Sequence, residues 1–231
     1  MSTYLQLCQD MARDIGIPGS GPSSVTSTSL SEEENAVVRH IKNADLDIQS
    51  RWFDWMFLWK EATMTSSSGT STLTSPSDIG NWNVDLVVWD KGTDNNLQLE
   101  YMPWGEYFEM YKMGVSDDND PEVFSVKPNN VIDLYPTPIS NTSVYAQYWQ
   151  IPTELAADSD VSAIPARFHR IIIARAKVYY AENEDAPEVL SGSLAEFEDL
   201  LDKLESDQLP GQKNRRMLKT QDLANFTVVP E

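Results

Sequence analysis

The chain has 231 residues and a net charge of −19, from 36 acidic and 17 basic side chains. A surface this acidic repels phosphates, so duplex DNA and anionic membranes are excluded as general partners. Seven Trp, nine Tyr and seven Phe can form a folded core, which excludes a chain that is disordered throughout.

The compartment is indicated by what the sequence lacks. Cys8 is the only cysteine, so no internal disulfide can form. The densest aliphatic run, Ile171–Ala174, is too short to cross a bilayer, and the first residues lack the basic and apolar regions of a signal peptide. We therefore expect a soluble protein that is made in the cytoplasm and has no membrane partner.

Two helices are predicted at the start of the chain. Apolar residues at steps of three and four predict the first over 3–15. Ser31 followed by Glu34 forms a capping box. The apolar pattern after this box predicts a second helix that continues to about Ala62 and is roughly 48 Å long. A loop rich in Gly, Pro and Ser joins the two helices.

The far end of this second helix, residues 52–59, is apolar on nearly every side. A helix that is apolar all round must be buried all round, either by another layer of the chain or by a neighbouring subunit. Trp and Met are enriched in the cores of subunit interfaces. The candidates for such an interface are Trp52, Trp55, Met56 and Trp59.

The middle of the chain is β-rich. Residues 63–77 are rich in Ser and Thr and are predicted as a loop. Short β-prone runs separated by turn clusters follow at 82–89, 97–101, 122–127, 131–135 and 144–149. A short helix is predicted over 103–113. These elements predict a small antiparallel β subdomain inserted between helices.

Helix returns after Pro165. The apolar pattern predicts one helix to about Glu182, a break over Asn183–Pro187, and a final amphipathic helix over 193–206. The predicted fold class is therefore α+β. A helical bundle of about four helices is expected from 1–64 and 163–208, a β-rich insertion from 65–162, and an extended C-terminal docking arm from 209–231.

The last two dozen residues differ in charge from the rest. Residues 208–231 carry a net charge of +2, so the remaining 207 residues sum to −21. Apolar side chains accompany the basic ones, which is typical of an arm that orders on a partner. A frayed terminus is the alternative interpretation. The candidate docking residues are Lys213, Arg215, Arg216, Met217, Leu218, Lys219, Leu223, Phe226 and Val228.

No reaction centre is evident. His40 and His169 lie in predicted helices without a second His or Cys at ligand spacing, so ordinary packing is favoured for both. The acidic turn 117–122 lacks the ligand spacing of a calcium loop, and the loop 16–24 lacks the lysine of a phosphate-binding loop. We therefore expect no catalytic residue, no cofactor, no metal and no enzymatic activity.

Three stretches of the sequence resemble one known family. They are Tyr4-Leu-Gln-Leu with Met11-Ala-Arg and Gly19-Ser-Gly-Pro-Ser-Ser, then Ala44-Asp-Leu-Asp-Ile-Gln-Ser-Arg with Trp52 to Trp59, and finally Tyr148-Trp149 with Ile164-Pro-Ala-Arg-Phe-His and the helix to Tyr180-Ala-Glu. In this order they are similar to the head-to-tail adaptor, or connector, proteins of tailed bacteriophages. Residues 65–140 match only weakly.

The resemblance implies a structural virion protein. Such adaptors form a ring, commonly a dodecamer, that is seated under the portal protein at the capsid vertex. Their C-terminal arm reaches onto the portal protein, and an inserted subdomain faces outward, where tail nozzle, tube or fibre proteins are the expected partners. DNA would pass through the channel of the ring without sequence-specific binding.

Two other functions stay open on the residues alone. A tail-completion or tail-tube protein would have a similar composition but would self-assemble without a portal protein. A hydrolase with an active site in the β region would be tested by metal analysis and by replacing His40 and His169 with alanine.

Overall fold

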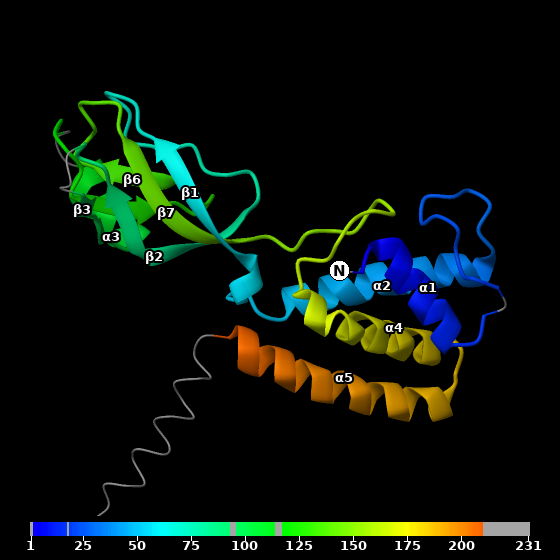
Figure 1. The fold of residues 1–231 in the computed structure, drawn as a ribbon. Coiled ribbons are helices and arrows are strands. Elements are labelled where there is room, and N and C mark those ends of the chain that lie inside the picture. Colours follow the sequence, from blue (N-terminus) through cyan, green and yellow to red (C-terminus); the bar gives the residue numbers. More distant parts are fainter. Residues whose placement is uncertain (1, 18, 93–95, 114–116, 210–231) are drawn as a thin grey trace, which may run out of the picture. The chain divides into compact units, whose positions relative to one another are not determined.

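The chain folds into two units, and most of their helices and strands are labelled in Figure 1. The computed structural model describes residues 2–17, 19–92, 96–113 and 117–209. Residues 1–57 and 152–231 form a helical unit, and residues 58–151 form a β unit. The protein is therefore α+β, as the sequence predicts.

The helical unit is organised around one central helix. Its elements are α1 (Tyr4–Asp14), α2 (Glu32–Ser50), a 3₁₀ turn η3 (Ala166–Phe168), α4 (Arg170–Asn183) and α5 (Pro187–Gln208). Helix α4 packs against both α2 and α5, while α1 packs against α2 and α4 (Figure 1). The isoleucines and alanines of α4 are buried on several of its sides, as its central position requires.

The starts of the first two helices are fixed by local capping. Ser31 Oγ accepts from the Glu34 amide at 3.1 Å, and Glu34 Oε2 accepts from the Ser31 amide at 2.9 Å. Thr3 and Gln6 form the same reciprocal pair at α1. The capping box predicted at Ser31 is confirmed, and each pair satisfies amides that a helix leaves without partners.

The second helix ends at Ser50, so the prediction that it continues to about Ala62 is wrong. The Ile48 carbonyl accepts from the Arg51 amide at 3.4 Å and from Trp55 Nε1 at 3.1 Å. The fully buried Trp55 indole thus folds back onto the last turn and ends the helix.

Residues 56–65, predicted as the end of this helix and the start of a loop, form a 3₁₀ turn η1 (Met56–Leu58) and a strand β1 (Trp59–Thr65). Burial alternates along β1, with Ala62 and Met64 inside, which is the period of a strand.

The final helix begins earlier than predicted. Helix α5 starts at Pro187, where the sequence suggested 193. Proline suits the first turn of a helix because the amide that it lacks would have had no helical partner. The break before α5 is confirmed, since α4 ends at Asn183.

The β unit contains two sheets. The first has the antiparallel order β1-β7-β2-β3, from β1, β7 (Ser143–Gln150), β2 (Ile79–Trp89) and β3 (Leu97–Gln98). The second has the order β4-β5-β6, from β4 (Glu100–Tyr101), β5 (Val123–Val126) and β6 (Ile132–Tyr135). The strands predicted in this region are present, although the run 97–101 is divided between the two sheets.

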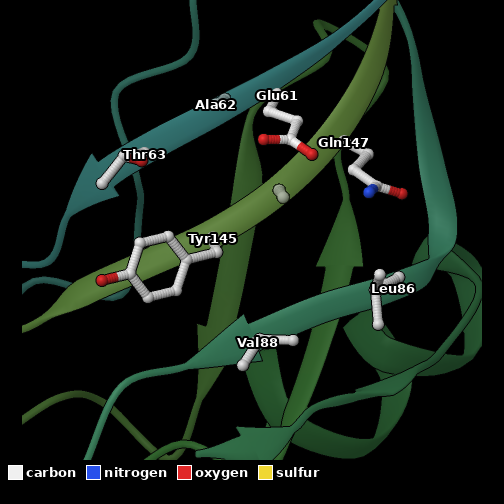
Figure 2. Close-up of a pocket in the computed structure, with 8 residues that line it drawn as sticks. Glu61, Ala62, Thr63, Leu86, Val88, Tyr145 and Gln147 are labelled. Atoms are coloured by element: carbon white, nitrogen blue, oxygen red, sulfur yellow. The ribbon is translucent and has the colours of Figure 1, made fainter. Parts of the chain in front are cut away.

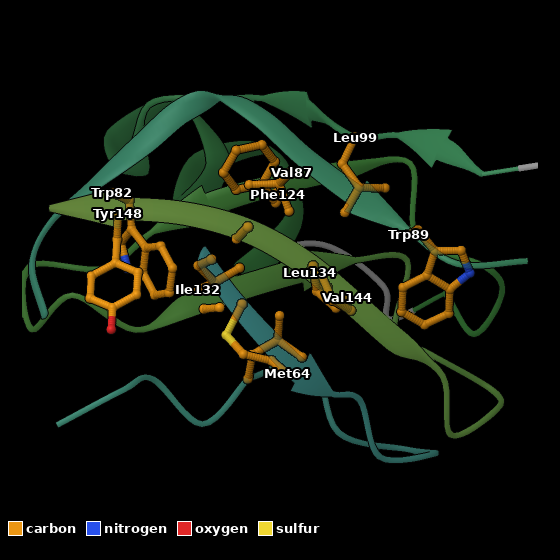
Figure 3. Packing of buried hydrophobic residues seen from close by; sticks show 13 residues of the cluster. Met64, Trp82, Val87, Trp89, Leu99, Phe124, Ile132, Leu134, Val144 and Tyr148 are labelled. Atoms are coloured by element: carbon orange, nitrogen blue, oxygen red, sulfur yellow. The ribbon is translucent and has the colours of Figure 1, made fainter. Parts of the chain in front are cut away.

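The core of the β unit gathers residues from both sheets (Figure 3). It is rich in aromatic and β-branched side chains, which pack well on pleated surfaces. The residues labelled in Figure 3 are Met64, Trp82, Val87, Trp89, Leu99, Phe124, Ile132, Leu134, Val144 and Tyr148.

A short helix lies beside the second sheet, where one was predicted over 103–113. It consists of α3 (Trp104–Tyr107) and a π-helical turn η2 (Phe108–Lys112). The buried carboxylate of Asp133 anchors it, because Tyr107 Oη donates at 3.2 Å and Lys112 Nζ at 3.0 Å.

Lys127 also contacts Asp133, at 2.8 Å. Burial alone would raise the pKa of Asp133, but hydrogen bonds from Lys127, Ser71 and Lys112 outweigh it and hold this pKa below its usual value.

Candidate interaction surfaces

The turn after α2 exposes large apolar side chains. Trp52, Phe53 and Met56 have exposed fractions of 44%, 64% and 46%. Trp52 Nε1 donates to Glu205 Oε1 at 3.0 Å, which fixes the indole against the last turns of α5. An exposed aromatic side chain that is already held in place loses little conformational entropy when it binds.

One of the four residues predicted as a subunit interface is not on the surface. Trp55 is completely buried, and its ring stacks on that of Phe57 with 5.2 Å between centroids. It is therefore a core residue of its own chain. Trp52 and Met56 lie on the exposed turn of the helical unit, whereas Trp59 is the first residue of β1 in the β unit and is also exposed.

A charged network stiffens the region next to this turn. Arg175 Nε contacts Asp47 Oδ2 at 2.8 Å, and Arg51 Nη2 contacts the same oxygen at 3.3 Å. Both guanidinium groups lie over the Phe197 ring, at 5.0 Å for Arg51 and 5.3 Å for Arg175. One carboxylate therefore neutralises two cations that contact the same aromatic ring, which ties α2, α4 and α5 together.

The outer face of the four-stranded sheet is a second exposed surface (Figure 2). Glu61 on β1 lies opposite Gln147 on β7, and one step along Thr63 lies opposite Tyr145. Val88 on β2 completes the row with Tyr145. These side chains line a shallow depression of about 220 Å³. This face was not predicted, because residues 59–65 were expected to be helix and loop. The alternation of Glu61 and Thr63 with Ala62 and Met64 was the available signal.

The outer side of α3 and η2 is a third exposed apolar surface. Phe108, Met110 and Met113 are all exposed, while Tyr107 on the inner side is buried. Tyr111 stacks on Tyr135 with 3.9 Å between ring centroids. The segment is thus anchored on one side and apolar on the other.

The predicted docking arm lies almost wholly outside the described residues. Helix α5 ends at Gln208, and Leu209, which follows it, is buried. The arm therefore begins from a fixed point. The candidate residues from Lys213 to Val228 fall in the range 210–231, so their role stays a prediction.

The two histidines are packing residues. His40 is buried and stacks on Tyr179, and burial lowers its pKa. His169 is buried, its Nε2 lies 3.0 Å from the Ile164 carbonyl oxygen, and burial likewise lowers its pKa. Among the described residues, no three His, Cys, Asp or Glu side chains are grouped so that they could hold a metal ion.

The acidic turn 117–122 is held by ordinary turn contacts. The Asn119 amide donates to the Thr137 carbonyl at 3.0 Å, and the Thr137 amide donates to the Asp117 carbonyl at 2.9 Å. Lys91 pairs with Asp120 at 3.5 Å. These contacts account for the shape of the turn.

Comparison with known proteins identifies the family. The SU10 adaptor protein family matches residues 2–220, which is nearly the whole chain. No curated protein matches the sequence significantly. Within the described residues, no helix is both long and apolar enough to span a bilayer. The extent of the match leads to one conclusion: the chain belongs to the SU10 adaptor protein family, a family of bacteriophage head-to-tail adaptors, and is a structural component of the virion.

Proposed function

We propose that the protein forms a ring that binds the portal protein at the capsid vertex and supports the tail. The family match over residues 2–220 carries this proposal, because head-to-tail adaptors connect these two parts of the virion. The ring is expected to be a dodecamer, with tail nozzle, tube or fibre proteins as partners on the tail side. No reaction is assigned to the protein.

The basic C-terminal segment is the proposed contact with the portal protein. The predicted arm, 209–231, follows helix α5, which ends at Gln208, and its first residue, Leu209, is buried. The apolar residues Leu223, Phe226 and Val228, with Met217 and Leu218, would anchor it in the partner. Its basic residues would set register and association rate. These are Lys213, Arg215, Arg216 and Lys219.

The exposed turn after α2 is the proposed contact between neighbouring subunits. Trp52 and Met56 present apolar surface that a single chain leaves open. A Trp side chain buries roughly 150–250 Å² in total, and an interface would cover the fraction of Trp52 that is still exposed. A heterologous interface of this kind closes into a ring when its rotation fits. Trp59 lies in the β unit, and its part in a subunit contact stays a prediction.

The acidity of the chain suits a channel for DNA. With a net charge of −19, most of the surface repels phosphates. A negatively charged wall lets DNA slide because it offers no cations that would exchange with the DNA counterions. DNA would therefore pass without sequence-specific binding.

Truncation tests the proposal. A chain that ends at Leu209 keeps this buried residue, so it should fold and stay soluble. We expect it to lose binding to purified portal rings, measured by size-exclusion chromatography with light scattering. The full chain without portal protein is the control, and it should stay unassembled; spontaneous tubes or rings would favour a tail-tube protein. Normal binding of the truncated chain to the portal protein would refute the role of the arm.

A further inference from the structure

We infer that the outer face of the four-stranded sheet docks a lysine- or arginine-bearing segment of another virion protein. One basic side chain would occupy the depression in Figure 2, with its aliphatic stem against Leu86 and Tyr145 and its cation at Glu61. The inference rests on the proposed function, and it names the site and the chemistry of a tail-side partner.

The depression exists because β2 is irregular. Asn83 pairs with Gln147 and Val87 pairs with Ala146, so residues 84–86 have no partners on β7. Gln98 Nε2 donates to the Asp85 carbonyl at 2.8 Å and holds this bulge in place. Bulges redirect side chains and are frequent at functional sites. Here the bulge contributes Leu86 to the wall of the depression, with 39% of the residue exposed.

The size of the depression indicates a side chain and not a small-molecule ligand. Its volume is about 220 Å³, whereas sites for drug-sized ligands are roughly 300–1,000 Å³. Leu86, Val88 and Tyr145 line the depression with apolar surface, which suits the aliphatic stem of a Lys or Arg side chain. The Tyr145 ring can also attract a cation placed over its face.

Charge determines which side chain fits. The β unit contains four basic residues, and each already contacts a carboxylate: Lys60 with Asp78, Lys91 with Asp120, and Lys112 and Lys127 with Asp133. Glu61 is exposed and, among the described residues, its carboxylate has no ion pair or hydrogen bond. The face therefore offers an unpaired anion and no unpaired cation, so the partner has to supply the positive charge.

Charge also disfavours a second copy of this sheet as the occupant. An identical face would place Glu61 and the exposed Asp85 near their own counterparts, and like charges in an interface are repulsive. Nucleic acid is disfavoured for the same reason. A basic segment with apolar neighbours complements both the negative charge of Glu61 and the apolar lining of the depression.

Photo-crosslinking in phage particles tests the inference. Thr65 lies on the same face, one row beyond Thr63, and does not line the depression. A chain with Thr65→benzoylphenylalanine should crosslink, on irradiation, to a segment of a different virion protein that contains Lys or Arg. The control Ile139→benzoylphenylalanine places the same group at an exposed position off the sheet, and it should not give this product.

Charge reversal then tests the role of Glu61. Glu61→Lys should lower the yield of the crosslink about tenfold or more, and Glu61→Gln should lower it less and weaken its dependence on salt. Glu106→Lys makes the same change on α3, off the sheet, and should leave the yield unchanged.

The inference fails if there is no product above the Ile139 control, if the product is a second copy of this chain, if the crosslinked segment lacks basic residues, or if both charge reversals act equally. The amount of chain incorporated into the particles, measured by mass spectrometry, reports separately on the proposed function.

Discussion

The indole of Trp52 donates its N–H to Oε1 of Glu205 at 3.0 Å and so joins the turn after α2 to the end of α5. The ring is held in one orientation although 44% of the residue is exposed. The proposed arm begins at Leu209, four residues after Glu205. The proposed subunit contact and the proposed portal contact are therefore both connected to the same end of α5.

Replacing Trp52 should weaken assembly more than it weakens the fold. Trp52→Ala removes exposed apolar surface, so we expect the free energy of unfolding of the single chain to fall by no more than about 1 kcal/mol. Association on the portal protein should weaken by about 2 kcal/mol or more per contact, or roughly 30-fold, if the residue is at the centre of an interface. Analytical ultracentrifugation with portal rings measures the association, and urea unfolding measures the stability.

The matched control for Trp52 is Ile139→Ala. Ile139 is also exposed, but it belongs to a loop of the β unit, so both stability and assembly should be unchanged. Equal losses of assembly in the two variants would mean that Trp52 has no special part in the interface.

The single cysteine should be unreactive in the folded protein. Cys8 has no exposed surface, and burial raises its pKa to about 12. The thiolate is the reactive form, so at pH 8 both its population and its access are restricted. A disulfide reagent such as dithionitrobenzoate should label the native chain only slowly and the chain in 8 M urea (a concentration of the order needed to unfold a domain) at once. Rapid labelling of the native chain would show that α1 opens readily.

The beginnings of the helices could be predicted from the sequence, because caps are local. Ser31 and Glu34 are three residues apart, and they make the predicted contacts. The end of α2 could not be predicted in this way. It depends on Trp55 folding back to the Ile48 carbonyl, and the sequence around it is apolar enough to continue as a helix.

The depression on the sheet was beyond prediction for a related reason. It needs the register between β2 and β7, which are separated by more than fifty residues in the chain, and a bulge at 84–86. A pattern of alternating residues indicates a strand but does not fix its partner or its register. The Trp52–Glu205 hydrogen bond is also long-range, because the two residues are 153 positions apart in the sequence.

Gly21 should be difficult to replace. Its φ of +75° is in the left-handed region, and a Cβ at this position would lie 2.9 Å from Ala12 Cβ. Gly21→Ala should therefore lower the free energy of unfolding by about 2–4 kcal/mol, from backbone strain and from the clash with α1. Thermal unfolding followed by circular dichroism measures the change.

The variant Gly16→Ala separates the effect of backbone strain from the effect of the clash with Ala12 at Gly21. Gly16 has a similar φ of +80°, but a Cβ there would meet no atom within 4 Å. This variant should carry the backbone strain alone and lose about 1 kcal/mol. If the two variants lose the same stability, the loop at Gly21 moves away from Ala12 and the clash is not a determinant of the fold.

Asp45 should make the helical unit less stable as the pH rises from about 4 to 6. The carboxylate is completely buried in α2; Ser162 Oγ donates to Oδ1 at 2.5 Å and Gln49 Nε2 donates to Oδ2 at 2.7 Å. Burial raises its pKa to about 6 from an ordinary value of 3.8, and the two hydrogen bonds offset only part of this.

The folded state therefore binds a proton more tightly at Asp45 than the unfolded state does. The stabilisation that this proton contributes is fully present below pH 3.8 and is lost as the pH rises through about 6. The total loss is on the order of 3 kcal/mol, which is the cost of ionising the buried group.

Asp45→Asn has the same shape and cannot ionise. Its oxygen can accept from Gln49, and its amide can donate to the hydroxyl of Ser162. Relative to the native sequence, this variant should thus gain stability with pH between about 4 and 6 and keep a constant advantage above that. Urea unfolding at several pH values measures the difference in unfolding free energy between the two chains. The contributions of the many carboxylates that they share cancel in this difference.

Asp45→Ala provides the contrast, because it removes the acceptor of Ser162 and Gln49 and should be destabilised at every pH. Parallel pH profiles for the native chain and Asp45→Asn would show that Asp45 is ionised at little cost inside the helical unit.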